Sequence, residues 1–359
     1  MSMFKGKNLQ MIIFGESHGA AVGVTITGLP PGLPLDQEQI AAALHRRAPG
    51  RDDFSTARKE DDTVQILSGV YDGKTSGTPL CAIIANTDTK SDDYGSTDVL
   101  RPGHADYTGK MRYQGFNDHR GGGHFSGRLT APLVFAGALA QTWLQQQGIV
   151  VGAHIASIAD IRDRMFDPCH ITAAILQELR QKPFAVLDEQ KGQAMQNAIL
   201  QAKADGDSVG GIIECAACNL PAGWGDPMFA GMESIISALL FAVPAVKGVE
   251  FGRGFAISGL KGSETNDPFA LENDKVITIS NHNGGINGGI TNGMPLVVRA
   301  AIKPTPSISK EQQSIDLEKG CPLALKIKGR HDPCIVPRAV VVVESALQIA
   351  LMDLGLNRR

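Results

Sequence analysis

Apolar residues recur at intervals of three and four in five segments, a spacing that is typical of buried or amphipathic helices. The segments are residues 36–48, 126–148, 187–206, 226–243 and 337–355. Asp36 and Gln39 have the spacing of a capping box, Asp188 is the expected cap at the start of the third segment, and glycines close the second and third. The pattern therefore predicts five helices, although the run of valines in the last segment also favours a strand.

Shorter stretches are rich in β-branched residues and carry turn residues at their ends, which predicts strands. They are residues 22–29, 63–73, 79–87, 246–259, 276–280 and 295–303, and residues 210–223 have the same pattern. Helix-like and strand-like segments are thus intermixed along the chain.

Two pairs of landmarks repeat in the same order, which indicates an internal duplication. GESHGAAVGVTITGLPPG begins at Gly15 and GDSVGGIIECAACNLPAG begins at Gly206; both reach L-P-x-G at the same offset. GKTSGTPL from Gly73 is matched by GITNGMPL from Gly289. We therefore expect related halves at about 10–130 and 205–345, with a helical insert at about 150–205 between them.

The duplication bears on FGESHG, in which Ser17 occupies the G-x-S-x-G frame of a hydrolase nucleophile. The second copy keeps the serine as Ser208 but has Val209 in place of His18. A serine found in both copies is best explained as a turn residue that bonds backbone. His18, which only one copy has, is the stronger candidate for chemistry.

Composition narrows the function. A net charge of −3 argues against a general nucleic-acid binder. No stretch reaches the roughly 18 apolar residues of a membrane span, and MSMFKGKNLQ lacks the apolar core of a signal peptide. We therefore expect a cytoplasmic protein that binds neither nucleic acid nor membrane.

Two nucleotide- or metal-type signals are weak. Cys215 and Cys218 form a lone C-x-x-C without a second pair, so no metal site is expected. SGVYDGKT has three residues between its glycines where a phosphate-binding loop needs four. We interpret it as a hairpin turn.

The remaining motifs place histidines and basic residues beside glycines in loops. The histidines are His18, His104, His119, His124, His282 and His331, and the basic residues are Arg46, Arg47, Arg101, Arg120, Arg128, Lys303 and Arg330. Guanidinium groups next to bare backbone amides are suited to hold phosphate and carboxylate. Histidines exchange protons near neutral pH. The pattern predicts a site for a small polyanionic molecule.

The motifs FGESHG, GLPPGLPL, RRAPG, RPGHADYT, RGGGHFSGRLTA, GGINGG, KPTPSI and GRHDPC resemble the chorismate synthase family over essentially the whole chain. The resemblance implies a single domain over residues 1–359 with an α+β fold, in which a helical layer lies between antiparallel sheets with internal pseudo-two-fold symmetry. It also implies a homotetramer. The implied reaction is the anti 1,4-elimination of phosphate from 5-enolpyruvylshikimate 3-phosphate, which gives chorismate and requires reduced FMN.

The resemblance also implies roles for individual residues. His18 matches a proton donor to the departing phosphate, His104 matches the histidine that protonates the reduced flavin, and Asp332 matches the aspartate that helps flavin N5 to remove the ring proton. The positions that match the lining of the substrate–flavin pocket are Arg47, Arg101, Arg128, Lys303 and Arg330. The positions expected against the flavin are His124, Ser126, Pro244, Ala245, Gly288, Lys303, Pro304, Thr305, Pro306, Ser307 and Arg330.

The chain departs from the family pattern at two places. RGGGHF has His124 and Phe125 where the family reads arginine and serine, which predicts a weaker contact of His124 with the FMN phosphate or ring edge. Asp53 stands where the family usually has an arginine, for which Arg51 is the candidate replacement. No G-x-G-x-x-G fingerprint is present, which favours an external flavin reductase over self-reduction with NADPH.

Two alternative functions are weighed against the lyase. One is a degenerate paralogue that binds flavin or a phosphorylated metabolite without turnover, and the presence of His18, His104 and Asp332 argues against it. The other is a serine hydrolase that uses Ser17, although residues 1–16 are too few for the strands that normally precede such a serine.

Overall fold

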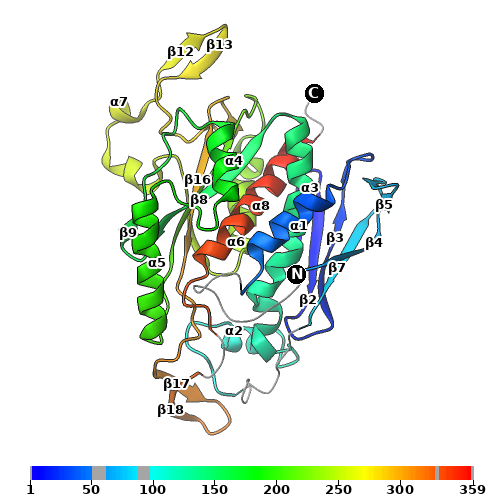
Figure 1. The fold of residues 1–359 in the computed structure, drawn as a ribbon, viewed down its shortest axis with the longest axis vertical. Helices are drawn as coiled ribbons and strands as arrows, with labels where there is room; N and C mark the ends of the chain where they lie inside the picture. Colours follow the sequence, from blue (N-terminus) through cyan, green and yellow to red (C-terminus); the bar gives the residue numbers. More distant parts are fainter. Residues whose placement is uncertain (1, 51–61, 88–97, 328–330, 357–359) are drawn as a thin grey trace.

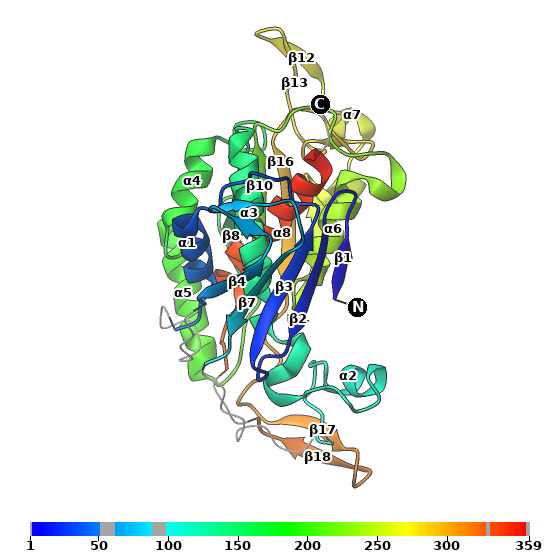
Figure 2. The same cartoon turned by 90° about the vertical axis from the view of Figure 1, so that its right-hand side faces the viewer.

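The structure is a computed structural model that describes residues 2–50, 62–87, 98–327 and 331–356. Two five-stranded sheets enclose a layer of helices (Figures 1 and 2). Every pairing within these sheets is antiparallel, and the sandwich of sheet, helices and sheet that the resemblance implied is confirmed.

The strands of the first sheet are, in spatial order, β1 (Met3–Lys5), β2 (Gln10–Gly15), β3 (Ala21–Thr27), β7 (Leu80–Ala85) and β4 (Val64–Ser68). Those of the second sheet are β11 (Val246–Phe251), β16 (Leu296–Ile302), β10 (Gly211–Cys218), β8 (Val150–Ile158) and β9 (Ile161–Arg162). Separate hairpins are β5 (Val70–Tyr71) with β6 (Lys74–Thr75), β12 (Phe269–Glu272) with β13 (Lys275–Thr278), β14 (Ile286–Asn287) with β15 (Ile290–Thr291), and β17 (Gln312–Asp316) with β18 (Cys321–Leu325). The α-helices are α1 (Gln37–Arg47), α2 (Asp106–Arg112), α3 (Thr130–Gln146), α4 (Ala173–Gln181), α5 (Glu189–Ala204), α6 (Met232–Ala242), α7 (Gly262–Thr265) and α8 (Val336–Gly355), and the short 3₁₀ segments are η2 (Arg120–Phe125), η3 (Gly127–Leu129), η4 (Met228–Ala230) and η5 (Gly254–Gly259).

Helices α3 and α8 form the centre of the molecule (Figure 1). In α8 every residue from Ala339 to Gly355 is buried, so its valines lie in a helix that is covered on all sides. Gly137 of α3 has no side chain where the two helices meet, and a Cβ there would overlap Ser345. The strand alternative for this segment is therefore wrong.

Local capping explains where the helices begin. Asp36 accepts a hydrogen bond from the backbone N–H of Gln39 at 2.9 Å, as predicted. The Gln39 side chain does not complete the capping box but donates to Thr142 of α3 at 2.9 Å. Asp188 caps α5 in the predicted way. The capping residues thus confirm both starts, and Gln39 ties α1 to α3.

Three expected segments differ from the structure. The helix expected at 226–243 begins only at Met232, after η4, and the strand expected at 246–259 ends at Phe251 and continues into η5. The insert expected to be helical at 150–205 begins with β8, a strand of nine residues that pairs with β10. Helices α4 and α5 then follow in that segment.

The pairing of strands agrees with the predicted duplication, which stays a prediction. The first repeated landmark contains β3 and the second copy contains β10; β3 pairs with β7, and β10 pairs with β16. The second pair of landmarks forms the hairpins β5–β6 and β14–β15. The segment YDGK is thus a two-residue hairpin turn, as interpreted, with positive φ at Asp72 and Gly73.

The second sheet contains a buried cluster of polar side chains around His154. His154 is 0% exposed; its Nδ1 lies 3.2 Å from Asp163 Oδ2 and its Nε2 lies 3.0 Å from Glu214 Oε2. Arg299 bridges Glu214 to Glu250 at 3.1 and 2.6 Å. Burial lowers the pKa of His154, but the bonds to both carboxylates outweigh it and raise the pKa above the ordinary value.

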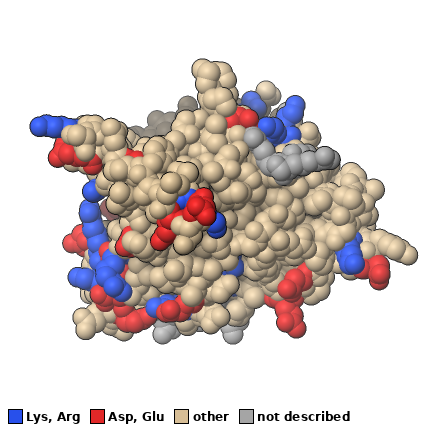
Figure 3. All heavy atoms as spheres, turned by 90° about the horizontal axis from the view of Figure 1, so that it is seen from above, with Lys and Arg blue, Asp and Glu red and all other residues tan. Residues whose placement is uncertain are grey.

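Among the described residues, no helix is both long and apolar enough to cross a membrane. Seen from above, the surface carries basic and acidic side chains near one another and a broad uncharged area (Figure 3). This end therefore does not present a patch of one sign.

Candidate functional site

A cavity of about 1610 Å³ is lined by residues of α2, the β17–β18 hairpin and the first turns of α3 and α8. Helix α2 and the β17–β18 hairpin lie at one end of the molecule (Figures 1 and 2). The cavity wall also includes β1, part of α6 and the segment after β16. Pockets for single small ligands usually measure about 300–1,000 Å³. The cavity is therefore large enough for two molecules side by side.

The charge of the cavity wall is strongly biased. Among the described residues, eight basic side chains line it, namely Lys5, Arg47, Arg101, Lys110, Arg128, Lys303, Lys326 and Arg338, against the two acids Asp106 and Asp332. The first turns of α3 and α8 also face it, and neither helix has a side-chain cap. Helix N-termini attract anions. The cavity is built for a polyanion.

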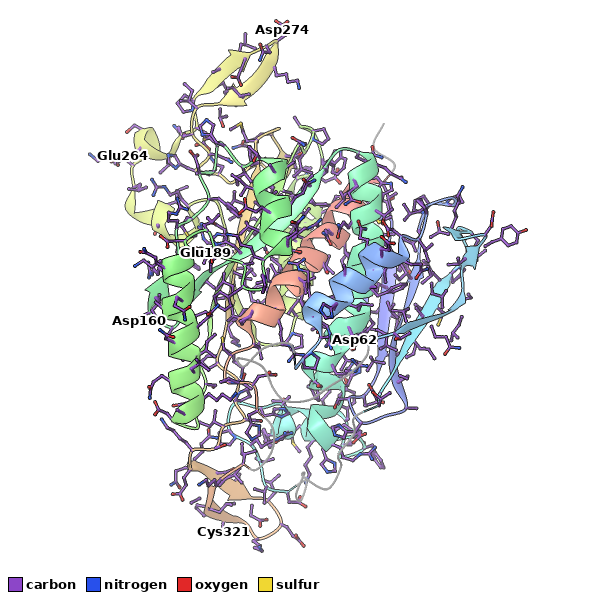
Figure 4. All side chains as sticks on the ribbon, in the orientation of Figure 1. Asp62, Asp160, Glu189, Glu264, Asp274 and Cys321 are labelled. Carbon is purple, nitrogen blue, oxygen red and sulfur yellow. The ribbon has the colours of Figure 1, made fainter. Side chains whose placement is uncertain are left out.

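Asp62 holds two of the arginines together (Figure 4). Its carboxylate accepts from Arg47 Nε at 2.9 Å and from Arg128 Nη1, and all three side chains are buried. Arg128 also donates to Asn86 at 2.9 Å. One carboxylate between two guanidinium groups leaves a net positive charge, so the cluster still favours an anion.

His18 is held against the glycine turn of η2. Ser17, which is 0% exposed, donates its hydroxyl proton to Arg120 O at 3.2 Å and lies 3.1 Å from His18 Nδ1. Its hydroxyl is therefore an acceptor for His18 Nδ1. A Cβ at Gly121 would overlap the ring of His18.

The serine thus has the structural role that the duplication suggested, although it bonds a distant backbone carbonyl and not its own. Ser208 does the same in the second half, where its hydroxyl donates to Thr305 O at 2.7 Å. A serine with no exposed surface is in no position to attack a substrate. The hydrolase alternative is wrong.

His104 is hydrogen-bonded to Asp106, which is also bound by Arg101. Its Nδ1 lies 2.7 Å from Asp106 Oδ1, and Arg101 holds the same carboxylate through Nε at 2.8 Å and Nη2 at 2.7 Å. Burial raises the pKa of Asp106, but the hydrogen bonds from Arg101 and His104 outweigh it and hold that pKa well below its usual range. Because Nδ1 is engaged, His104 Nε2 is the atom available to a ligand.

Asp332 lies at the start of α8. Its Oδ2 accepts from Arg338 Nη1 at 2.9 Å, and Arg338 Nε donates to the backbone carbonyl of Arg47 at 3.1 Å. Arg338 thereby orients Asp332 and fixes its loop to the end of α1.

His124 stays a predicted weak contact of the flavin, and its ring is hydrogen-bonded within the protein. Its Nδ1 lies 2.8 Å from Gly15 O, and its Nε2 is bonded by the hydroxyl of Ser2. Both nitrogens are thus used within the protein, although the ring lines the cavity. Phe125 packs near Tyr113 with ring centroids 6.3 Å apart. His124 and Phe125, which replace the family's arginine and serine, therefore contact other loops around the cavity.

The segment after β16 forms the opposite wall. Lys303 N donates to Ala245 O at 2.9 Å, and Lys303 Nζ donates to Gly103 O at 2.6 Å. Ala245 has φ of 74°, a strained value for a residue with a side chain. Thr305 Oγ1 is buried and has no hydrogen-bond partner among the described residues. Strain and an orphaned hydroxyl at one wall are typical of a ligand site.

The structure brings most of the predicted site residues together. Those in the cavity wall are His18, Arg47, Arg101, His104, His124, Ser126, Arg128, Pro244, Ala245, Lys303, Thr305, Pro306, Ser307 and Asp332. Pro304 and Gly288 are not in this wall, and Gly288 forms the turn between β14 and β15. Arg330 lies outside the described residues, as do Arg51 and Asp53.

Sequence reasoning missed several residues of the wall. His119 and His331 were named with the loop motifs but had no role, and Arg338 follows Asp332 by six positions. Nothing in the local pattern around Asp62 singled it out. His282, also a loop histidine, lies elsewhere and accepts from Arg253 at 3.1 Å.

The C-x-x-C pair is part of the core. Cys215 and Cys218 are three residues apart in β10, so they point to opposite faces, and both are buried. Burial raises the pKa of both thiols. No cluster of three or more metal-binding side chains is found among the residues that the structure describes.

Three comparisons with known proteins point to the same family. The family model described as "Chorismate synthase" matches residues 9–356. The chain is 46% identical over 358 residues to the chorismate synthase of Dehalococcoides mccartyi strain BAV1, which covers 99% of this chain and 97% of the relative. It is 47% identical to that of Thermococcus kodakarensis over 356 residues, which covers 99% and 98%. A solved structure titled "Crystal Structure of Chorismate Synthase" superposes with a TM-score of 0.77 at 29% identity and covers 98% of this chain and 93% of that one.

Proposed function

The chain belongs to the chorismate synthase family, and we propose how its cavity carries out the family's reaction. That reaction is a lyase reaction of the shikimate pathway, in which 5-enolpyruvylshikimate 3-phosphate loses phosphate and a ring proton by anti 1,4-elimination to give chorismate. The family implies a reduced flavin cofactor. The relatives and the complete set of His18, His104 and Asp332 leave the degenerate-paralogue alternative without support.

The observation that carries the proposal is the bias of the cavity wall, with eight basic and two acidic side chains. The substrate bears a phosphate and two carboxylates, which guanidinium and ammonium groups bind well. We propose that Arg47, Arg101, Arg128, Lys303 and Arg330 contact these anions. The net charge of the chain is −3, so the excess of cations in the wall is a local property of the site.

The wall also fits a flavin. The orphaned hydroxyl of Thr305 and the strained backbone at Ala245 lie in one stretch of wall. We propose that this stretch, with Pro244, Pro306 and Ser307, holds the ring system of the flavin. Pro304 and Gly288 are outside the cavity wall, and we propose that they contact the flavin only where a movement of this chain or a neighbouring copy brings them to it. The bound reduced flavin would supply electron density that helps the allylic phosphate to leave.

The proton positions follow from the hydrogen bonds. Ser17 fixes Nδ1 of His18, so we propose that His18 donates the proton at Nε2 to the departing phosphate. Asp106 fixes Nδ1 of His104, so His104 would act through Nε2 at the flavin. Asp332, oriented by Arg338, would assist removal of the ring proton. Each role uses one defined atom.

Finer features are also proposals. We propose that the flavin is FMN, that an external flavin reductase and not NADPH oxidation by this chain supplies its electrons, and that the protein is a cytoplasmic homotetramer. We propose one domain over residues 1–359 that arose by duplication. The matching pairs β3–β7 and β10–β16 support the duplication.

The test is chorismate formation from 5-enolpyruvylshikimate 3-phosphate under anaerobic conditions with reduced FMN. Oxidised FMN with NADPH, before dithionite is added, tests whether the chain reduces its own flavin. His18→Ala is expected to lower kcat by about 10²–10⁴-fold, the usual contribution of a positioned general acid. His170→Ala is the matched control, because its side chain is 79% exposed and far from the proposed chemistry. Equal turnover by His18→Ala and the control would contradict the proposed role.

A further inference from the structure

His331 of the GRHDPC motif has no role assigned so far. It lies in the cavity wall next to Asp332 and is half-buried. Its Nε2 is buried and has no hydrogen-bond partner among the described residues. A buried acceptor or donor without a partner is costly and therefore rare in folded proteins. Its presence in a ligand cavity suggests that a ligand provides the partner.

The protonation state of His331 can be worked out from its surroundings. Its ring is hydrogen-bonded to the backbone of Ile327, and because Nε2 makes no bond, this bond uses Nδ1–H as donor to the carbonyl. Burial lowers the pKa of His331 more than the bond to Ile327 raises it, and the charge of Arg101 lowers it further. The ring is therefore neutral near pH 7, and Nε2 carries a lone pair.

Among the described residues, the wall combines basic side chains with neutral hydrogen-bond acceptors, one of which is Nε2 of His331. The eight basic side chains can only donate hydrogen bonds, which suits the phosphate and carboxylates of the substrate. Those anionic groups cannot donate to Nε2. The substrate has a single other polar group on its ring, a free hydroxyl, and this is its one hydrogen-bond donor when the acids are ionised.

We propose that Nε2 of His331 accepts a hydrogen bond from the free ring hydroxyl of the substrate, so that His331 determines specificity for a hydroxylated ring. The proposal rests on the proposed function. Arg101, whose charge reaches His331, belongs to the set proposed to bind the substrate anions, and both residues line the same cavity.

Two variants of His331 test whether the hydrogen-bond acceptor or the bulk of the imidazole ring matters for binding. His331→Gln places an amide oxygen at about the reach of Nε2, whereas His331→Leu removes the acceptor. Each is compared with the unchanged protein on the natural substrate and on an analogue that lacks the ring hydroxyl. Binding of both compounds and of FMN is measured at equilibrium, and kcat/KM is measured anaerobically with reduced FMN. His170→Leu is the control for loss of a histidine.

We expect His331→Leu to weaken binding of the natural substrate about tenfold, as for a lost neutral hydrogen bond. It should change binding of the analogue less than twofold, and His331→Gln should restore most of the loss. The unchanged protein should bind the analogue about tenfold more weakly than the natural substrate. FMN affinity should not change in any variant.

Equal losses on both compounds, or a loss confined to FMN, would overturn the proposal. Thermal unfolding of both variants shows whether they are folded. The binding measurement does not require turnover, so it tests His331 separately. If the unchanged protein forms no chorismate from the natural substrate, the proposed function fails. The comparison of the two compounds then still decides the role of His331.

Discussion

Asp62→Asn is the sharpest test of how the cavity is assembled. Asp62 accepts from Arg47 and Arg128, and the three side chains are buried together. Asparagine has the same size but no charge, so the two guanidinium groups would face each other without their shared counterion. Breaking a buried ion pair by removing one partner costs about 3–5 kcal/mol. We expect the free energy of unfolding to fall by about that amount.

The corresponding shift in melting temperature can be worked out from the length of the chain. Unfolding entropy is about 2.1 cal/mol/K per residue, so 359 residues give about 0.75 kcal/mol/K. A loss of 3–5 kcal/mol then lowers Tm by about 4–7 °C. Urea unfolding and thermal scans at one protein concentration measure both quantities. Asp160→Asn is the control, because Asp160 is exposed at the turn between β8 and β9 (Figure 4) and should change stability by less than about 0.5 kcal/mol.

Inorganic phosphate adds a second readout. An anion that binds only the folded protein stabilises it in proportion to its affinity. Because Asp62→Asn leaves Arg47 and Arg128 with more net positive charge, phosphate should raise the Tm of this variant more than that of the unchanged protein. The reasoning is refuted if Asp62→Asn unfolds like Asp160→Asn, or if phosphate stabilises both proteins equally.

Three further predictions concern the histidines and the turn beside them. Gly121→Ala should lower kcat at least tenfold, because its Cβ would overlap the imidazole of His18, the proposed proton donor, whereas Gly148 also has positive φ but open space around it, so Gly148→Ala should leave kcat unchanged in steady-state assays. Asp106→Asn should lower kcat/KM by about 10–100-fold, because His104 loses the carboxylate that orients it. It should also remove a stabilisation that is present above about pH 4 and lost as pH falls, since the pKa of Asp106 is depressed in the folded protein. The raised pKa of His154 contributes stability that is fully present below about pH 6.5 and lost as pH rises through the folded value. Urea unfolding between pH 6 and 9 should therefore show a decline in the unchanged protein that is absent in His154→Gln.

Periodicity and capping predicted the helices well because their signals are local. Asp36 and Asp188 accept from backbone N–H groups in the next turn, so their effect is visible in a few residues of sequence. Strand β8 was missed for a physical reason. It is buried on both faces, so its apolar run lacks the alternation that marks a half-exposed strand.

The site was predictable where its residues form motifs and hidden where they depend on the fold. The loops with His18, His104 and Asp332 converge on one cavity, as the resemblance implied. Asp62 binds Arg47 and Arg128, and Arg338 binds the backbone carbonyl of Arg47. These contacts join segments that are separate in the sequence. The short sequence around Asp62 or Arg338 contains no cap, turn or repeat that distinguishes it from an ordinary surface charge.

Ser17 and Ser208, which the predicted duplication makes equivalent, both hold loops of the candidate site. Ser17 ties the first G-x-S loop to Arg120 O, in the turn before α3, and Ser208 ties the second loop to Thr305 O. Each serine therefore holds one wall of the same cavity, which accounts for its presence in both halves. The residue after each serine can differ between the two loops, because it takes no part in the hydrogen bond from the serine hydroxyl to the backbone carbonyl. His18 in one half supplies a proton-transfer group, whereas Val209 in the other packs against the core. With the roles proposed above, this one unequal position would set a proton donor against one side of the bound substrate and leave the other side for the flavin.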